Sequence, residues 1–140
     1  MKSTIQTPPL LISSMLTYGS TVHADAKVIT WTGEGSRTTT FAEVGTKSAQ
    51  LAHALRGLGI TGDQRVATFM WNNAEHLIAY LAVPSMGAVL HALNIRLFPP
   101  QIIYVTTHAD NKVVIVDNTL AKPFSGLLPH LKTLRHVIVN

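Results

Sequence analysis

Three polar residues, His91, Asn94 and Arg96, are the side chains of this sequence best placed for binding chemistry. They lie at the exit of the apolar run 88–93, which we expect to form a strand, and open α/β sheets bind ligands beyond the carboxyl ends of their strands. An arginine there can hold a carboxylate or a phosphate in a bidentate arrangement. A purely structural role stays open, in which Arg96 anchors a neighbouring loop and Asn94 caps a turn.

The remaining polar residues form no recognisable catalytic or metal-binding motif. The seven histidines never fall in H-E-x-x-H or another compact ligand spacing; they are residues 23, 53, 76, 91, 108, 130 and 136. The serines lack a G-x-S-x-G elbow, and only seven carboxylate side chains are available for acid–base pairs. Because cysteine is absent, disulfides and thiolate chemistry are excluded. We therefore expect no catalytic residue and no metal ligand in this chain, and spacing alone assigns no reaction class.

The element that must position these side chains is a strand–helix–strand unit over residues 65–97. Residues 65–70 form a short apolar run typical of a strand buried on both faces. Asn72 is expected to cap the following helix, with Glu75 reaching back to the cap amide. That helix should kink or fray near Pro84 and stop at Gly87, before the second strand. His76, on this helix, is expected to be a hydrogen-bonded packing residue.

The rest of the sequence repeats this alternation. Further helices are expected over 8–16, 41–58, 99–108 and 120–131, and further strands over 27–31, 37–39, 112–117 and 136–139. Thr40 and Glu43 are expected to form a capping box at the start of the helix over 41–58. The later strands recur every 23 to 25 residues with helices between them, which is the spacing of right-handed crossover connections. The expected fold is therefore α/β: a doubly wound, mostly parallel sheet flanked by helices, with a small N-terminal β-hairpin.

Composition excludes several classes of protein and points to an incomplete domain. Hydrophobic residues make up 46% and charged residues 13%, against a charged share of roughly 25% in soluble domains. Such a charge-poor surface is expected to be covered by further chain beyond residue 140 or by a partner. The net charge of +4 is scattered singly, which argues against nucleic-acid binding and suits anionic small molecules or loose membrane contact.

The apolar stretch 77–95 is too interrupted by 84–87 to be a membrane span. A poor match to a signal peptide near the N-terminus is likewise rejected. We expect a cytoplasmic protein with at most peripheral membrane contact.

Three stretches carry a resemblance to a known family: T-T-F-A-E-V through A-L-R-G-L-G-I, then G-D-Q-R-V-A, then W-N-N-A-E-H-L-I-A-Y-L-A-V-P-S-M-G-A-V-L-H-A-L-N-I-R-L. Over residues 8–140 the sequence resembles the N-terminal part of adenylate-forming acyl-CoA synthetases, and it is most similar to medium- and long-chain fatty-acid CoA ligases. The resemblance implies that residues 1–140 belong to the large AMP-binding domain, with residues 1–26 as an N-terminal arm.

The resemblance also implies a reaction and its cofactors. A fatty acid attacks ATP, accompanied by Mg²⁺, to give an acyl-adenylate and pyrophosphate, and CoA then displaces AMP to give the thioester. The family's phosphate loop, ribose-binding Asp and late catalytic Lys have no counterpart in these 140 residues. We therefore expect an inactive fragment that binds none of these cofactors tightly, whose partner is the remainder of its own polypeptide; a homodimer is possible. Two alternatives stay open: another adenylating enzyme, acting on aryl or amino acids, and a non-enzymatic interaction domain.

Overall fold

A computed structural model describes residues 9–140 as an α/β fold built around a four-stranded parallel sheet. The strand order is β4-β3-β5-β6, with β3 at Arg65–Phe69, β4 at Val89–Ala92, β5 at Val113–Val116 and β6 at His136–Val139. In register, Ala67 pairs with His91 on one side and with Val114 on the other. All four residues of β5 are buried, as expected for an apolar run in a sheet covered on both faces.

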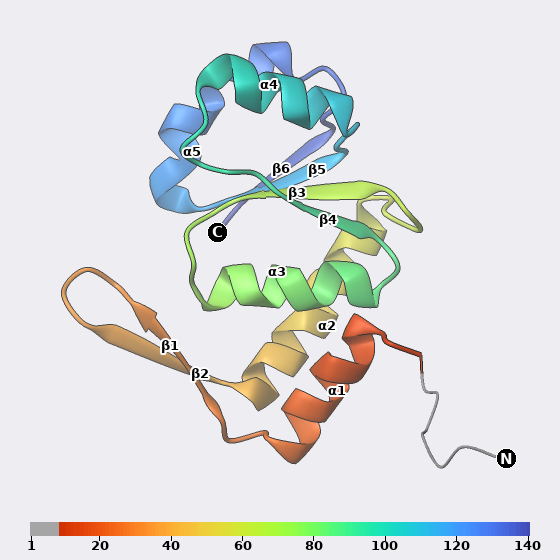
Figure 1. Cartoon of the computed structure of the whole chain (residues 1–140), viewed down its shortest axis with the longest axis vertical. Helices are drawn as coiled ribbons and strands as arrows, with labels where there is room; N and C mark the ends of the chain where they lie inside the picture. The colour runs from red at the N-terminus through yellow and green to blue at the C-terminus, as the bar shows by residue number, and fades with distance from the viewer. Residues whose placement is uncertain (1–8) are drawn as a thin grey trace, which may run out of the picture.

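Helices cover both faces of this sheet (Figure 1). Helices α2 (Phe41–Gly57) and α3 (Ala74–Ser85) lie on one face, and α4 (Pro99–His108) and α5 (Asn118–Ser125) lie on the other. Alternate residues of the strands enter two separate cores. Val66 and Val113 pack with Leu55 and Val83 on the first face, whereas Val114 packs with residues of α4 and α5 on the second. The expected doubly wound arrangement is confirmed.

The direction of winding reverses between β3 and β5. From β3 the chain passes through α3 to the edge strand β4, then returns through α4 to place β5 on the opposite side of β3. The loops that leave β3 and β5 therefore diverge toward opposite faces of the sheet. Such a switch point leaves a crevice at the carboxyl ends of the strands, where open α/β sheets bind ligands.

The N-terminal segment packs beneath α2 and α3. Helix α1 spans Ile12–Val22, and an antiparallel hairpin follows, with β1 at Lys27–Trp31 and β2 at Ser36–Thr40. The expected helix over 8–16 was wrong in its bounds: Pro9 precedes the helix, and residue 8 lies outside the described residues. The helix extends to Val22 because its second half is held against α2, where a Cβ on Gly45 would lie 2.6 Å from the Cβ of Ser20.

The helix ends test the expected capping residues. Thr40 and Glu43 form the expected capping box of α2, since the Thr40 hydroxyl accepts from the Glu43 amide at 3.2 Å and the Glu43 carboxylate accepts from the Thr40 amide at 2.7 Å. The expected cap of α3 was wrong by one residue. Asn73 is the cap, and its Oδ1 accepts from the His76 amide at 2.8 Å. Glu75 pairs with Arg37 of the hairpin instead of with the cap.

The remaining elements match the expected ones closely. Helix α3 ends at Ser85, one residue after Pro84, and Gly87 follows with a φ of 92°, a left-handed conformation that favours glycine. The expected helix over 120–131 is divided into α5 and a 3₁₀ turn, η1, at Leu128–His130. Of the helices described over residues 9–140, none is long and apolar enough to cross a membrane.

Candidate functional site

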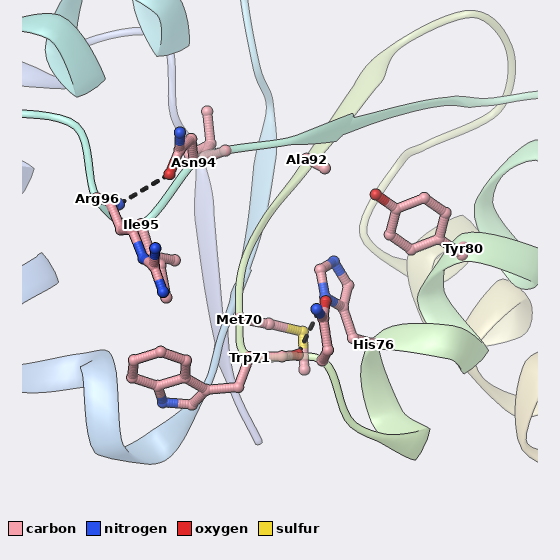
Figure 2. A pocket seen from close by; sticks show the side chains of 10 residues that line it. Met70, Trp71, His76, Tyr80, Ala92, Asn94, Ile95 and Arg96 are labelled. Carbon is pink, nitrogen blue, oxygen red and sulfur yellow. Dashed lines mark hydrogen bonds between the residues drawn. The ribbon is translucent and has the colours of Figure 1, made fainter. Parts of the chain in front are cut away.

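A pocket of about 460 Å³ lies at the carboxyl ends of β3 and β4 (Figure 2). The loop after β3, the first turns of α3 and the loop after β4 contribute its walls. Its lining residues are Met70, Trp71, Asn72, His76, Tyr80, Ala92, Leu93, Asn94, Ile95 and Arg96. This is the edge at which a doubly wound sheet presents its ligands, so the pocket is the candidate functional site.

Two of the three residues expected from the sequence line this pocket. The Oδ1 of Asn94 accepts from the backbone amide of Arg96 at 2.9 Å, which closes a tight turn after β4. Figure 2 shows Arg96 on the same side of the pocket as Trp71, with Tyr80 on the opposite side. Arg96 is the only arginine or lysine among the lining residues of this pocket, so it is the group that would attract an anion.

His91 is not among the residues that line the pocket. It lies within β4, three residues before Asn94, and its Nδ1 accepts from the Nδ2 of Asn111 at 2.8 Å. The Asn111 side chain is fully buried and also donates to the carbonyl of Thr106, in α4. His91 thus joins the strand to the end of α4.

His76 was expected to be a packing residue, and the structure confirms its hydrogen bonds while also placing it in the pocket wall. Its Nδ1 lies 3.1 Å from the carbonyl oxygen of Trp71, which can only accept, so Nδ1 carries the proton. Its Nε2 then accepts from the Thr68 hydroxyl at 2.9 Å. Burial lowers the pKa of His76 below its ordinary value, against the opposing effect of the Trp71 carbonyl. The imidazole is therefore held neutral with both nitrogens occupied, which disfavours a role as a general base.

Trp71 and Tyr80 are site residues that the sequence did not reveal. Each residue is about half exposed, at 48% and 46%, although both carry large aromatic side chains. The available signal was position: Trp71 is the second residue after β3, in the loop that leaves the strand at the switch point. With Ile95 and Met70 they give the pocket an apolar wall beside one cationic side chain. Such a pocket can bind an anion that carries an apolar group.

A resident metal ion does not fit the residues at hand. Within residues 9–140, no group of three or more His, Cys, Asp or Glu side chains is arranged to hold one. We therefore assign no metal ligand to this part of the chain.

Comparison with known sequences identifies relatives over nearly the whole chain. Residues 18–140 match the family described as AMP-binding enzyme. The chain is 45% identical over 108 residues to the long-chain-fatty-acid–CoA ligase of Thermus thermophilus, covering 77% of the chain and 20% of that protein. It is 38% identical over 127 residues to the medium-chain-fatty-acid–CoA ligase of Ectopseudomonas oleovorans, covering 88% and 23%. It is 35% identical over 132 residues to the 3-methylmercaptopropionyl-CoA ligase of Ruegeria pomeroyi, covering 94% and 24%.

Solved structures share the fold. The anthranilate CoA ligase AuaEII in complex with anthranoyl-AMP superposes with a TM-score of 0.85 at 24% identity, covering all of this chain and 27% of that one. A fatty acyl CoA synthetase of Mycobacterium tuberculosis gives 0.82 at 24% identity, covering 93% and 26%. The chain thus spans about a quarter of the length of the proteins that it matches.

Proposed function

Because the chain belongs to the AMP-binding enzyme family, we propose that it forms the N-terminal part of an ATP-dependent acid–CoA ligase. In the proposed reaction a carboxylate displaces pyrophosphate from ATP to form an acyl-adenylate, and the thiol of CoA then displaces AMP to form the thioester. The observation that carries this proposal is the family match over residues 18–140, which includes every element of the parallel sheet.

We propose a medium- or long-chain fatty acid as the substrate. The identities of 45% and 38% to fatty-acid–CoA ligases support this choice. A short thioether acid is the second candidate, because the relative named 3-methylmercaptopropionyl-CoA ligase aligns with a larger share of the chain, 94%, than the long-chain enzyme does. Aryl and amino acids remain alternatives that a panel of acids can separate.

Within this proposal the pocket at the ends of β3 and β4 lies close to a substrate. Arg96 would meet an anionic group, and Asn94 would keep the turn that carries Arg96 in place through its 2.9 Å hydrogen bond. His91 would act indirectly, without contacting the substrate, by fixing the end of β4 through its hydrogen bond with Asn111. ATP, Mg²⁺ and CoA are cofactors of the proposed whole enzyme, and no residue of this chain is proposed to be catalytic.

The proposal is tested by comparing the product of the complete reading frame with the 140-residue chain. Each purified protein is given ATP, Mg²⁺, CoA and one acid from a panel of C3 thioether, C8, C16, aryl and amino acids, and acid-dependent AMP and acyl-CoA are measured. We expect both products from the complete protein, with the highest rate on C8 or C16, and neither from the chain alone.

A preference for the C3 thioether acid would favour the second candidate. Activity of the 140-residue chain alone would contradict the proposal that it is an inactive part. If neither protein forms AMP with any acid, the interaction-domain alternative becomes the better explanation.

Location and assembly are also proposed. We propose a cytoplasmic enzyme that contacts membranes at most peripherally and that can form a homodimer. Cell fractionation, flotation with anionic vesicles and light scattering of the complete protein would test these three points.

A further inference from the structure

A chain of hydrogen bonds reaches Trp71 from across the switch point of the sheet. The Trp71 indole, in the loop after β3, donates its Nε1–H to the hydroxyl of Thr119 at 2.9 Å, 48 residues later in the sequence. The Thr119 hydroxyl donates in turn to Oδ1 of Asp117 at 2.7 Å. Asp117 is the residue that directly follows β5 and caps α5. The side chain of Trp71 is thus tied to the end of the neighbouring strand.

The chemistry of these groups permits only one arrangement. An indole nitrogen can only donate and a carboxylate can only accept, so the Thr119 hydroxyl must use its proton toward Asp117 and its lone pair toward Trp71. Asp117 is held as well, because its Oδ1 accepts from the Thr119 amide at 3.0 Å and its Oδ2 accepts from Nδ2 of Asn73 at 3.0 Å. Asp117 is 9% exposed, so its own hydrogen bonds are partly shielded from water, whereas the bond between Trp71 and Thr119 is exposed.

The backbone of Trp71 is fixed from the other side. Its carbonyl accepts from Nδ1 of His76, and Asn73, which is bound to Asp117, caps the helix that carries His76. The backbone and the side chain of Trp71 are therefore both restrained, although the residue is 48% exposed. Holding an exposed aromatic ring in one orientation costs side-chain entropy and adds little to the core, where Phe69 and Phe124 already pack together. A restrained ring at a pocket wall is better explained by recognition of a ligand than by stabilisation of the core.

We propose that Asp117 and Thr119 are positioning residues that hold the Trp71 indole as a fixed wall of the pocket, where it selects the apolar part of the acid. This role rests on the proposed ligase function. Trp71 presents a flat apolar surface on the side of the pocket that also carries Arg96, so an acid whose anionic end meets Arg96 would lay its apolar group along the indole.

The positioning is tested with Trp71 as its own reporter. The only other tryptophan is Trp31, which is 71% exposed on the hairpin, so Trp31→Phe leaves a single indole. In that background we compare Thr119→Val, which removes the hydroxyl but keeps the shape, with Thr119→Ser, which keeps the hydroxyl. We expect Thr119→Val to raise acrylamide quenching of Trp71 and to lower its anisotropy, and Thr119→Ser to match the parent.

A measurement on the unmodified chain keeps the test decisive if Thr119→Val does not fold. Hydrogen exchange of the two indole N–H groups is followed by NMR, and we expect the Trp71 signal to exchange roughly five- to tenfold more slowly than the Trp31 signal, as a hydrogen bond of ordinary net strength predicts. Equal exchange rates, or unchanged quenching in a folded Thr119→Val variant, would overturn the positioning role.

The selective role is tested on the complete protein. We expect Thr119→Val to raise KM for the preferred acid roughly tenfold while kcat changes little, and Thr119→Ser to restore KM, because a lost wall removes binding in ground and transition states alike. An unchanged KM together with a mobile Trp71 would overturn the selective role. If no acid is activated at all, the ligase proposal fails, whereas the fluorescence and exchange results still decide whether Trp71 is positioned.

Discussion

The Nε2 of His76 lies 2.9 Å from the hydroxyl of Thr68, and this buried pair joins the central strand β3 to helix α3. Thr68 is fully buried and His76 is 7% exposed. Since the other imidazole nitrogen donates to the Trp71 carbonyl, a second proton on Nε2 would face the hydroxyl oxygen only after the Thr68 hydroxyl had rotated. The neutral imidazole is therefore part of the packing of the pocket wall.

This pair predicts a loss of stability in mild acid. Burial lowers the pKa of His76 in the folded chain, so the unfolded chain takes up the proton first as the pH falls. The contribution of the neutral His76 to stability is complete above the ordinary histidine pKa of about 6.5. It is lost as the pH falls from there toward the lower pKa of His76 in the folded chain. Urea unfolding should show that the free energy of unfolding falls more between pH 7.5 and pH 5.5 in the parent than in His76→Asn, whose side chain can still donate to the Trp71 carbonyl. Equal drops in the two proteins would contradict this assignment.

The close contact of α1 with α2 predicts different results for alanine substitutions at two glycines of α2. A Cβ on Gly45 would lie 2.6 Å from Ser20, whereas a Cβ on Gly57 would meet nothing within 4 Å. We expect Gly45→Ala to lower the free energy of unfolding by about 1–3 kcal/mol through overpacking. Gly57→Ala should leave it unchanged or raise it by up to about 1 kcal/mol. Urea unfolding of both variants measures the difference, and a Gly45→Ala protein as stable as the parent would show that α1 is not held against α2.

The ion pair of Arg37 with Glu75 predicts a modest coupling between the hairpin and α3. Burial acts to raise the pKa of Glu75, but the hydrogen bond from Arg37, a backbone amide and the charges of Arg37 and Lys47 together lower it. A double-mutant cycle of Arg37→Met and Glu75→Gln should give about 0.5–1 kcal/mol near pH 7 and less in 1 M salt. Because the pKa of Glu75 is lowered, the coupling is present above the ordinary glutamate pKa and is lost as the pH falls below it. A coupling of zero at pH 7 and low salt would contradict the contact.

The sequence predicted those parts of the fold that depend on neighbouring residues. The capping box at Thr40 and Glu43, the stop at Gly87 and the helix over 99–108 are local signals, and each occurs as expected. The N-cap of α3 does not depend on neighbouring residues alone. Asn72 and Asn73 are equally good caps by sequence, but Asn73 is the cap in the structure, and its side-chain amide also donates to Asp117. Glu75 pairs with Arg37 instead of with the cap. Both of these partners are distant in sequence.

The candidate site shows the same limit. The strand exit identified Asn94 and Arg96, which line the pocket, but strand alternation directs His91 elsewhere, toward Asn111. Trp71 and Tyr80 were missed because an aromatic residue in an apolar segment predicts burial, and only tertiary contacts such as Thr119 explain an exposed, oriented ring. The sequence pattern thus could not predict the side chains whose orientation depends on long-range hydrogen bonds.

Arg96 carries the last prediction, which concerns catalysis in the complete protein. Since Arg96 is the only arginine or lysine lining the pocket, removing its charge should weaken binding of whichever anionic group the pocket receives. Hydrogen bonds to charged groups contribute roughly 1.5–3 kcal/mol, so Arg96→Met should lower kcat/KM by roughly ten- to hundredfold. Arg96→Lys should recover only part of this loss, because an ammonium cannot form the bidentate contact.

Arg56 provides the matched control for this experiment. It is exposed in the last turn of α2 and does not line the pocket, so Arg56→Met removes the same charge from another surface. We expect this control to keep kcat/KM within about twofold of the parent, because a surface charge remote from the pocket is screened by salt. Equal losses in the two variants would indicate a general effect of net charge, and full activity of Arg96→Met would remove Arg96 from the site.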